Sequence, residues 1–256
     1  MKNIYKITLL ICVGLLFGCS GGGDDSPNGC GDLNLKVFGG DQCRFERSPV
    51  VAIVGFAIDG TPIGVCSATM VTVNDALTAA HCSELTSAPG GAGVFADGVF
   101  HSIVTGTNHP LYDGSTASPY DVAMITIDRV LDIAPVPLLI SDSIAVDESI
   151  TIFGYGKNED YTGIPQATDF RAGFMDIGAI TPFEFAAKFN SRGSAVCQGD
   201  SGGPATQRVN GVTSIVGVTT YTINGCQDGA VSGFVNVQNP QIYQFIKAYA
   251  ADVTLR

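Results

Sequence analysis

Hydrophobic and polar positions alternate along short stretches of the chain. In one further stretch, the hydrophobic positions recur at the spacing of a helix. In the segment SPYDVAMITID, residues 118–128, Asp121 opens an alternating apolar and polar run, which is typical of a β-strand. The segment DALTAAHC, residues 75–82, is a short β-type run that ends in small residues. Residues 239–253 carry apolar side chains at the spacing of an amphipathic helix, at Ile242, Phe245, Ile246 and Tyr249. The pattern predicts a chain of strands with a helix near its C-terminus.

The composition agrees with this prediction. Among 256 residues, 32 are Gly and only 14% are charged, which favours many short strands joined by tight turns over a helical bundle. The length suffices for one large β domain or two fused halves that share a core. The formal net charge of −11 argues against nucleic acid as a partner, because phosphate binding needs clustered Lys and Arg.

The N-terminal segment reads as a targeting signal. Lys2 and Lys6 precede the apolar run Ile7–Phe17, which has the length of a signal peptide and is too short to span a bilayer comfortably. The motif LFGC resembles the bacterial lipobox, whose cysteine, here Cys19, is lipidated and becomes the new N-terminus. The alternative is an ordinary secretory signal with an incidental cysteine. Both alternatives predict an exported protein, either an outer-membrane or cell-surface lipoprotein or a periplasmic or secreted protein.

The cysteines suit an exported chain, because disulfides persist in oxidising compartments. Once Cys12 in the signal and Cys19 are set aside, an even set remains, namely Cys30, Cys43, Cys66, Cys82, Cys197 and Cys226. An even set indicates a disulfide framework. The chain has no C-x-x-C pair, and His81, His101 and His109 have no metal-ligand spacing, so no metal site is expected.

The segment CQGDSGGP, residues 197–204, raises the question whether Ser201 is a nucleophile. A serine hydroxyl attacks only if a base takes its proton and donors stabilise the charge that develops. His81 is a candidate base, although a lone histidine is more often a surface residue at a strand end. Asp121 precedes a strand, where an aspartate is usually a turn former. The order His81, Asp121, Ser201 is a stronger signal than any of the three alone.

From Val37 to the C-terminus the sequence resembles the trypsin/chymotrypsin-like serine proteases. TAAHC resembles the family's histidine motif, YDVAMITI its aspartate motif and GDSGGP its nucleophile motif. VFGG resembles the activated N-terminus, and FGYGKN the start of the second barrel. The resemblance implies an all-β fold of two packed six-stranded antiparallel β-barrels, over about 37–140 and about 141–256, with the C-terminal helix docked on the second barrel.

The resemblance also implies a chemistry, that of a serine endopeptidase that acts on protein or peptide substrates without a cofactor. His81 would take the proton from Ser201 as it attacks a peptide carbonyl, and Asp121 would orient the imidazole and stabilise its positive charge. The backbone N–H groups of Gly199 and Ser201 would form the oxyanion hole. Two alternatives remain open: a non-catalytic binding module on the same fold, and a surface adhesion lipoprotein.

Activation by cleavage is a further implication of the resemblance. A cut between Lys36 and Val37 would free an α-amino group that inserts into the second barrel and pairs with Asp200. Residues 1–18 would then be the signal peptide, and residues 19–36 a lipid-anchored tether and pro-segment. The primary product would be inactive until this cut.

The resemblance places Ala195, Val196, Thr222 and Ser232 in the specificity pocket. Trypsin-like members carry an Asp at the position of Ala195 and so select Lys or Arg, whereas the pocket floor here is apolar and uncharged. Thr222 and Ser232 stand where wide-pocket members have glycine and should narrow the pocket. We expect a preference for small or medium apolar residues before the scissile bond. Such a pocket should not cut efficiently after Lys36, so a separate activating protease is expected.

Two disulfides match pairs of the family, Cys66–Cys82 and Cys197–Cys226. The usual partner of Cys43 in the second barrel is absent, which leaves Cys30 and implies a Cys30–Cys43 bridge. Each of the two family bridges should contribute about 2–4 kcal/mol by restricting the unfolded chain.

Overall fold

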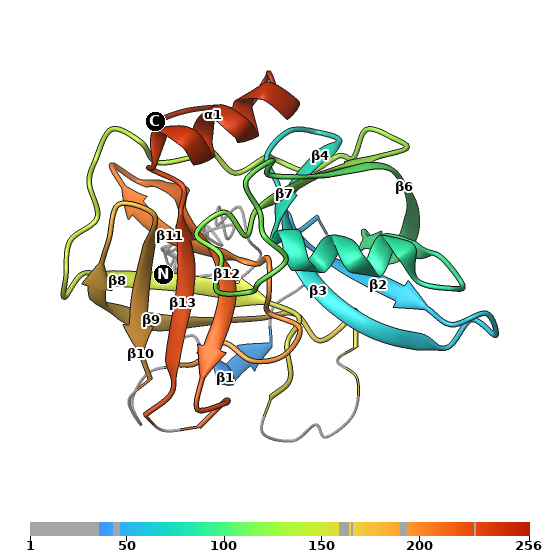
Figure 1. Cartoon of the computed structure of the whole chain (residues 1–256), viewed down its shortest axis with the longest axis horizontal. Coiled ribbons are helices and arrows are strands. Elements are labelled where there is room, and N and C mark those ends of the chain that lie inside the picture. Colours follow the sequence, from blue (N-terminus) through green and yellow to red (C-terminus); the bar gives the residue numbers. More distant parts are fainter. Residues whose placement is uncertain (1–35, 43–46, 159–163, 165, 190–193, 228) are drawn as a thin grey trace, which may run out of the picture.

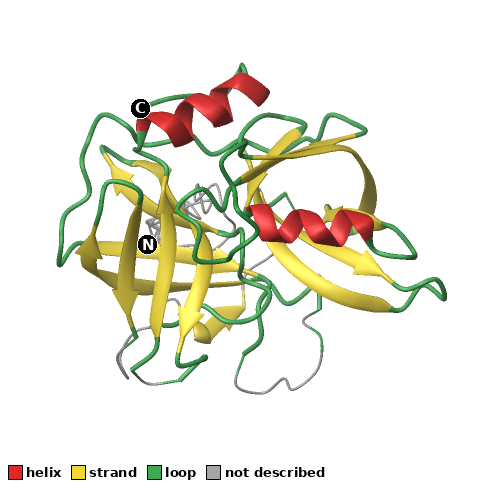
Figure 2. Ribbon diagram, in the orientation of Figure 1, coloured by secondary structure: helices red, strands yellow, loops and turns green. Residues whose placement is uncertain are grey.

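Two β-barrels lie side by side in the computed structural model of the chain, and the helix α1 (Pro240–Tyr249) lies over one end of the second barrel and reaches the junction with the first (Figure 1). The structure describes residues 36–42, 47–158, 164, 166–189, 194–227 and 229–256. Strands form both barrels, and the helical segments of the described chain are the 3-10 helix η1 (Ala80–Ser87) and α1 (Figure 2). The expectation of two six-stranded antiparallel barrels with a C-terminal helix is confirmed.

The first barrel is closed by strands in the order β2-β3-β4-β7-β6-β5. They are β2 (Val50–Phe56), β3 (Pro62–Met70), β4 (Asp75–Thr78), β5 (Ala92–Ala96), β6 (Val99–Asn108) and β7 (Ala123–Ile127). β2 reads VVAIVGF without alternation because both of its faces are buried. Val51 and Ile53 pack in the cluster of this barrel. Val50 and Val54 pack instead with residues of the second barrel such as Tyr155. The side chains of β2 therefore form part of the interface between the two barrels.

The second barrel is closed because β8 pairs with both β9 and β11. Its strands are β8 (Ser149–Gly154), β9 (Arg171–Ile180), β10 (Glu184–Lys188), β11 (Pro204–Val209), β12 (Val212–Ile223) and β13 (Val231–Asn236). The strand β1 (Lys36–Gln42) adds to β9, where Gln42 pairs with Arg171. The sequence-based division placed this segment in the first barrel. The structure assigns it to the second, because the ladder partner of β1 is β9.

The helix α1 begins at a capped end and packs at the junction of the barrels. The side chain of Asn239 accepts a hydrogen bond from the N–H of Gln241 at 2.9 Å, and Pro240 suits the first helical position because it has no N–H to satisfy. The ring of buried Phe245 lies 4.9 Å from that of His109 in the first barrel. The helix therefore packs on the first barrel as well as on the predicted second one.

Among the described residues, no helix is long and apolar enough to cross a membrane.

Candidate active site

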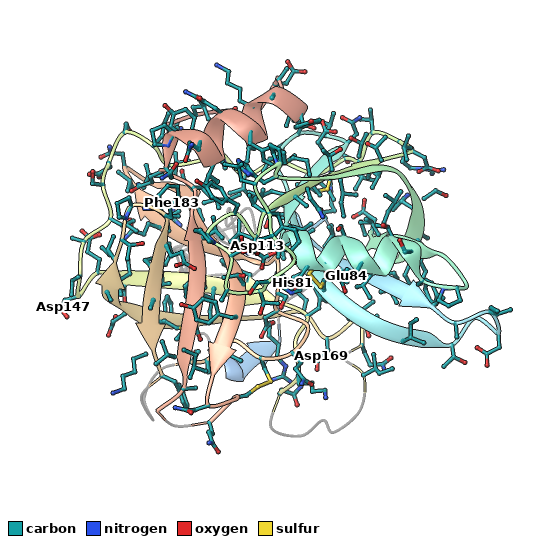
Figure 3. The ribbon with its side chains drawn as sticks, in the orientation of Figure 1. His81, Glu84, Asp113, Asp147, Asp169 and Phe183 are labelled. Carbon is teal, nitrogen blue, oxygen red and sulfur yellow. A yellow bond between two sulfur atoms is a disulfide. The ribbon has the colours of Figure 1, made fainter. Side chains whose placement is uncertain are left out.

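The pairing of β4 with β7 brings a histidine and an aspartate together. These strands are antiparallel and pair Thr78 with Ala123, so residues after β4 lie beside residues before β7. Asp121 lies two residues before β7. His81 lies in the first turn of η1 rather than at a strand end, because β4 stops at Thr78. Figure 3 shows His81 where the two barrels meet.

Asp121 is fully buried and holds His81 at two points. Its Oδ2 lies 2.7 Å from Nδ1 of His81, and its Oδ1 accepts the backbone N–H of His81 at 2.9 Å. The hydroxyl of Thr220, on β12 of the second barrel, donates to the same Oδ2. A proton on Nδ1, shared with the carboxylate, leaves Nε2 as the basic nitrogen of the ring. The His81 side chain is 19% exposed, so this nitrogen can be reached from the surface.

Ser201 lies on a loop that packs against the segment carrying His81. Gly202 has a φ of +82°, and a Cβ at this position would collide with the hydroxyl of Thr78. The Sγ of Cys82 lies 3.5 Å from the carbonyl oxygen of Ser201. Glycine after the serine thus allows the close approach of the two barrels, and Ser201 itself remains partly exposed.

Two of the predicted disulfides lie in the described chain and fasten this site. Cys66–Cys82 joins β3 to η1, with Cα atoms 6.0 Å apart, and Cys197–Cys226 joins the loop of Ser201 to the chain after β12, with Cα atoms 5.3 Å apart. The sulfurs of Cys66–Cys82 lie near His81, but their bond to each other leaves no thiolate for a metal. The predicted Cys30–Cys43 bridge lies outside the described residues, as does Cys19.

Gly199 and Ser201 present backbone N–H groups at this loop. The N–H of Asp200 donates to the carbonyl of Cys197 at 3.0 Å, and Gly199 has a φ of +101°. These are the features of a type II turn, whose third residue needs a positive φ. Within the part of the chain that the structure describes, neither the Gly199 nor the Ser201 N–H donates to another protein group. Both are available to an acceptor on a substrate.

Asp200 is buried against two backbone donors. It is 1% exposed, its Oδ1 accepts the N–H of Gly156, and its Oδ2 accepts the N–H of Cys197, both at 2.8 Å. Burial raises the pKa of Asp200 to about 7, although the two backbone N–H donors lower it. The negative charge of Asp169 adds to the rise, and the positive charge of Arg171 opposes it. Among the described residues, no cationic side chain forms an ion pair with Asp200. A cation placed beside the carboxylate of Asp200 would therefore be stabilised there.

A family model described as Trypsin matches residues 37–246. The chain belongs to the trypsin family. It is 24% identical over 227 residues to a trypsin of Simulium vittatum, covering 80% of this chain and 90% of the relative. It is 29% identical over 214 residues to a trypsin of Saccharopolyspora erythraea, covering 74% and 88%. It is 25% identical over 232 residues to a chymotrypsin-like serine proteinase of Haliotis rufescens, covering 81% and 90%.

The residues that resemblance to the trypsin family assigns to the specificity pocket lie together. Ala195, Val196 and Ser232 are buried, and the N–H of Val196 donates to the Oγ of Ser232 at 3.3 Å. Thr222 on β12 is the cross-strand partner of Ser232 on β13. The hydroxyl of Thr222 donates to the carbonyl of Gly225 at 3.1 Å. None of the four assigned side chains carries a charge.

A cavity of about 190 Å³ lies beside Gly199 and was not predicted from the sequence. Its lining includes residues 63–65, Lys157 and Gln198. The Lys157 ammonium donates to the Gln198 side-chain oxygen at 2.7 Å. Because Gly199 borders it, this cavity lies beside the predicted oxyanion hole.

Sequence reasoning also missed Thr220, which bonds Asp121 from the other barrel. Its neighbourhood, VTTYT, is an ordinary strand sequence, and threonine is common in strands for packing reasons alone. Gly156 had a clearer signal, because it belongs to the motif FGYGKN. A Cβ at this position would collide with the carboxylate of Asp200.

Proposed function

We propose that the chain is a serine endopeptidase in which Ser201 is the nucleophile, His81 the general base and Asp121 the residue that orients the base. The observation that carries the proposal is the His81–Asp121 pair, joined at 2.7 Å beside the loop of Ser201. A serine hydroxyl becomes nucleophilic only with such a base. The relatives bear the names of trypsins and of a serine proteinase, which supports the same reaction class.

In this proposal, Nε2 of His81 takes the proton from Ser201 as the Oγ attacks the carbonyl carbon of a peptide bond. The buried carboxylate of Asp121 stabilises the imidazolium that forms. The substrate oxygen becomes an oxyanion and accepts hydrogen bonds from the N–H groups of Gly199 and Ser201. His81 then gives its proton to the leaving amine. A water molecule, deprotonated by the same nitrogen, attacks the carbonyl carbon of the acyl group. The bond from this carbon to the Oγ of Ser201 then breaks as His81 returns the proton to the Oγ, and the acid product leaves.

The proposed enzyme is made as a precursor and is cut between Lys36 and Val37. The new α-ammonium group of Val37 pairs with Asp200. Support comes from the burial of Asp200 and its raised pKa, since a buried carboxylate without a counter-charge is costly and an ammonium group offsets that cost. The chain after the cut already pairs with β9 of the same barrel. A separate protease makes the cut.

The proposed substrate preference follows from the pocket residues Ala195, Val196, Thr222 and Ser232. Their lack of charge removes the attraction that a Lys or Arg side chain would need. Thr222 and Ser232 carry side chains on the adjacent strands β12 and β13, at positions where a wide pocket would need glycine. The preference is therefore for small or medium apolar residues before the scissile bond.

The two disulfides of the described chain indicate an exported protein, because such bonds persist in oxidising compartments. Lipid attachment at Cys19 is part of the proposal on sequence grounds alone. If Cys30 is bonded to Cys43, the bridge spans the cut at Lys36 and keeps the catalytic part attached to the membrane anchor.

Fluorophosphonate labelling tests the mechanism. Protein cut between Lys36 and Val37 should be labelled at Ser201, as read by mass spectrometry of the modified peptide, and Ser201→Ala should not. The variant should unfold at the same temperature as the wild type, since it loses one hydroxyl and no packing group. A peptide library digested by the cut protein measures the pocket preference. Correctly cut wild-type protein that takes no label would refute the proposal and favour a non-catalytic binding module.

A further inference from the structure

Ser67 contacts both residues whose N–H groups face the substrate in the proposed function. It lies on β3 of the first barrel and is fully buried. Its backbone N–H donates to the carbonyl of Ser201 at 2.8 Å. Its hydroxyl donates to the carbonyl of Gly199 at 2.9 Å. One serine therefore binds the carbonyl groups of Gly199 and Ser201 from behind, while their N–H groups are available on the substrate side.

The hydroxyl proton of Ser67 has a defined direction. The N–H of Tyr155 donates to the Oγ of Ser67 at 3.0 Å, which occupies the acceptor side of this oxygen and directs its proton to the carbonyl of Gly199. The carbonyl of Ser67 in turn accepts the hydroxyl of Thr78 at 2.8 Å. Each polar atom of Ser67 is thus used, in a site without access to solvent.

We propose that Ser67 is a positioning residue for the oxyanion hole, an inference that rests on the proposed function. Gly199 has no side chain with which to anchor itself, and its backbone has a wide choice of conformations. An external bond to its carbonyl fixes the peptide that joins it to Asp200. Because Ser67 belongs to the barrel that carries His81, the same bond sets the position of the hole relative to the base. Oxyanion donors must be held within about 0.5 Å of the productive geometry.

The two bonds of Ser67 differ in what they require of the sequence. Any residue except proline at position 67 would supply the N–H for Ser201. Only a side-chain donor reaches the carbonyl of Gly199. Ser67→Ala therefore removes one bond to the loop and leaves the other, which makes it a specific perturbation.

Steady-state kinetics of the cut enzyme test the inference. We expect Ser67→Ala to lower kcat about 10- to 100-fold, with KM changed less than about threefold, since an interaction made in the transition state is weakened. A peptide boronate, whose tetrahedral adduct with Ser201 places an oxygen at the two N–H groups, should lose affinity by a factor similar to the loss in kcat. Activity is expressed per folded molecule, counted by the thermal unfolding amplitude.

Thr206→Val is the matched control. Thr206 is a buried hydroxyl of the same barrel as Ser201, and it donates to the carbonyl of Thr151 at 3.1 Å. Its loss should lower the unfolding temperature and leave kcat and the boronate affinity unchanged. If Ser67→Ala does not fold, Ser67→Cys takes its place, because it keeps the size of the side chain and supplies a weaker S–H donor. A lower kcat with unchanged KM is then expected for Ser67→Cys.

The outcomes separate this inference from the proposed function. Wild-type protein that neither cleaves peptides nor takes the fluorophosphonate label overturns the function itself. An active wild type whose Ser67 variants keep full kcat and full boronate affinity overturns only the role of Ser67. Equal losses in Ser67→Ala and Thr206→Val would also overturn it, because they would show a general effect on stability.

Discussion

The buried carboxyl group of Asp200 should make the stability of the uncut chain depend on pH. Burial raises its pKa from 3.8 to about 7, so the folded chain keeps a proton that the unfolded chain releases near pH 4. The stabilisation by this proton is complete below about pH 4 and is lost as the pH rises through about 7. At about 1.4 kcal/mol per pH unit, the free energy of unfolding falls by about 4 kcal/mol over this window.

Urea unfolding of the uncut protein between about pH 4 and pH 8 measures this change. The Ser201→Ala background prevents self-digestion, and far-ultraviolet circular dichroism is a suitable probe because the chain has no Trp. Asp200→Asn is the matched variant, since its amide does not ionise and keeps an oxygen for the N–H of Gly156. We expect the wild-type chain to lose about 4 kcal/mol relative to Asp200→Asn across the window. Parallel curves for the two proteins would refute the reasoning.

Cleavage between Lys36 and Val37 should reverse the sign of this dependence of the free energy of unfolding on pH. An ammonium group beside Asp200 favours the charged carboxylate and lowers its pKa. The stabilisation is then present at neutral pH and is lost as the pH falls through the lowered pKa. A pH dependence that cleavage leaves unchanged would contradict the pairing of the new terminus with Asp200.

Three further predictions concern the site and its support. Asp121→Asn should lower kcat about 10⁴-fold in initial-rate assays, because the amide does not hold the His81 tautomer with its proton on Nδ1; a loss below about tenfold would contradict the orienting role. Gly156→Ala should destabilise the chain by about 1–3 kcal/mol in urea unfolding, because the added Cβ collides with the carboxylate of Asp200. Unchanged stability would contradict this prediction, since it would show that the loop of Asp200 moves aside without an energetic cost. Purified precursor incubated alone should not be cut at Lys36, as followed by mass spectrometry; second-order, Ser201-dependent conversion would show that the pocket accepts Lys.

The sequence predicted the fold and the neighbourhood of His81, Asp121 and Ser201 because motifs in a fixed order rarely arise by chance. It did not predict Thr220 or Ser67. Each is a hydroxyl residue within an ordinary strand. Thr220 lies 99 residues from its partner Asp121 along the chain, and Ser67 lies 132 residues from its partner Gly199. A strand sequence specifies which face a side chain occupies, but the group that it meets there depends on how the barrels pack. The same limit applies to β1, whose partner strand is set by tertiary geometry.

Each disulfide of the described chain lies within a single barrel. Among the described residues, the side chains of the two barrels meet through non-covalent interactions, among them the outer face of β2 against Tyr155 and the hydrogen bond from Thr220 to Asp121. In the proposed mechanism, the base His81 comes from one barrel and the nucleophile Ser201 from the other. The proposed activity thus depends on the interface between the two barrels. In this respect the molecule resembles an obligate heterodimer whose two subunits share one polypeptide. A small displacement of one barrel against the other should abolish the proposed activity while both barrels remain folded.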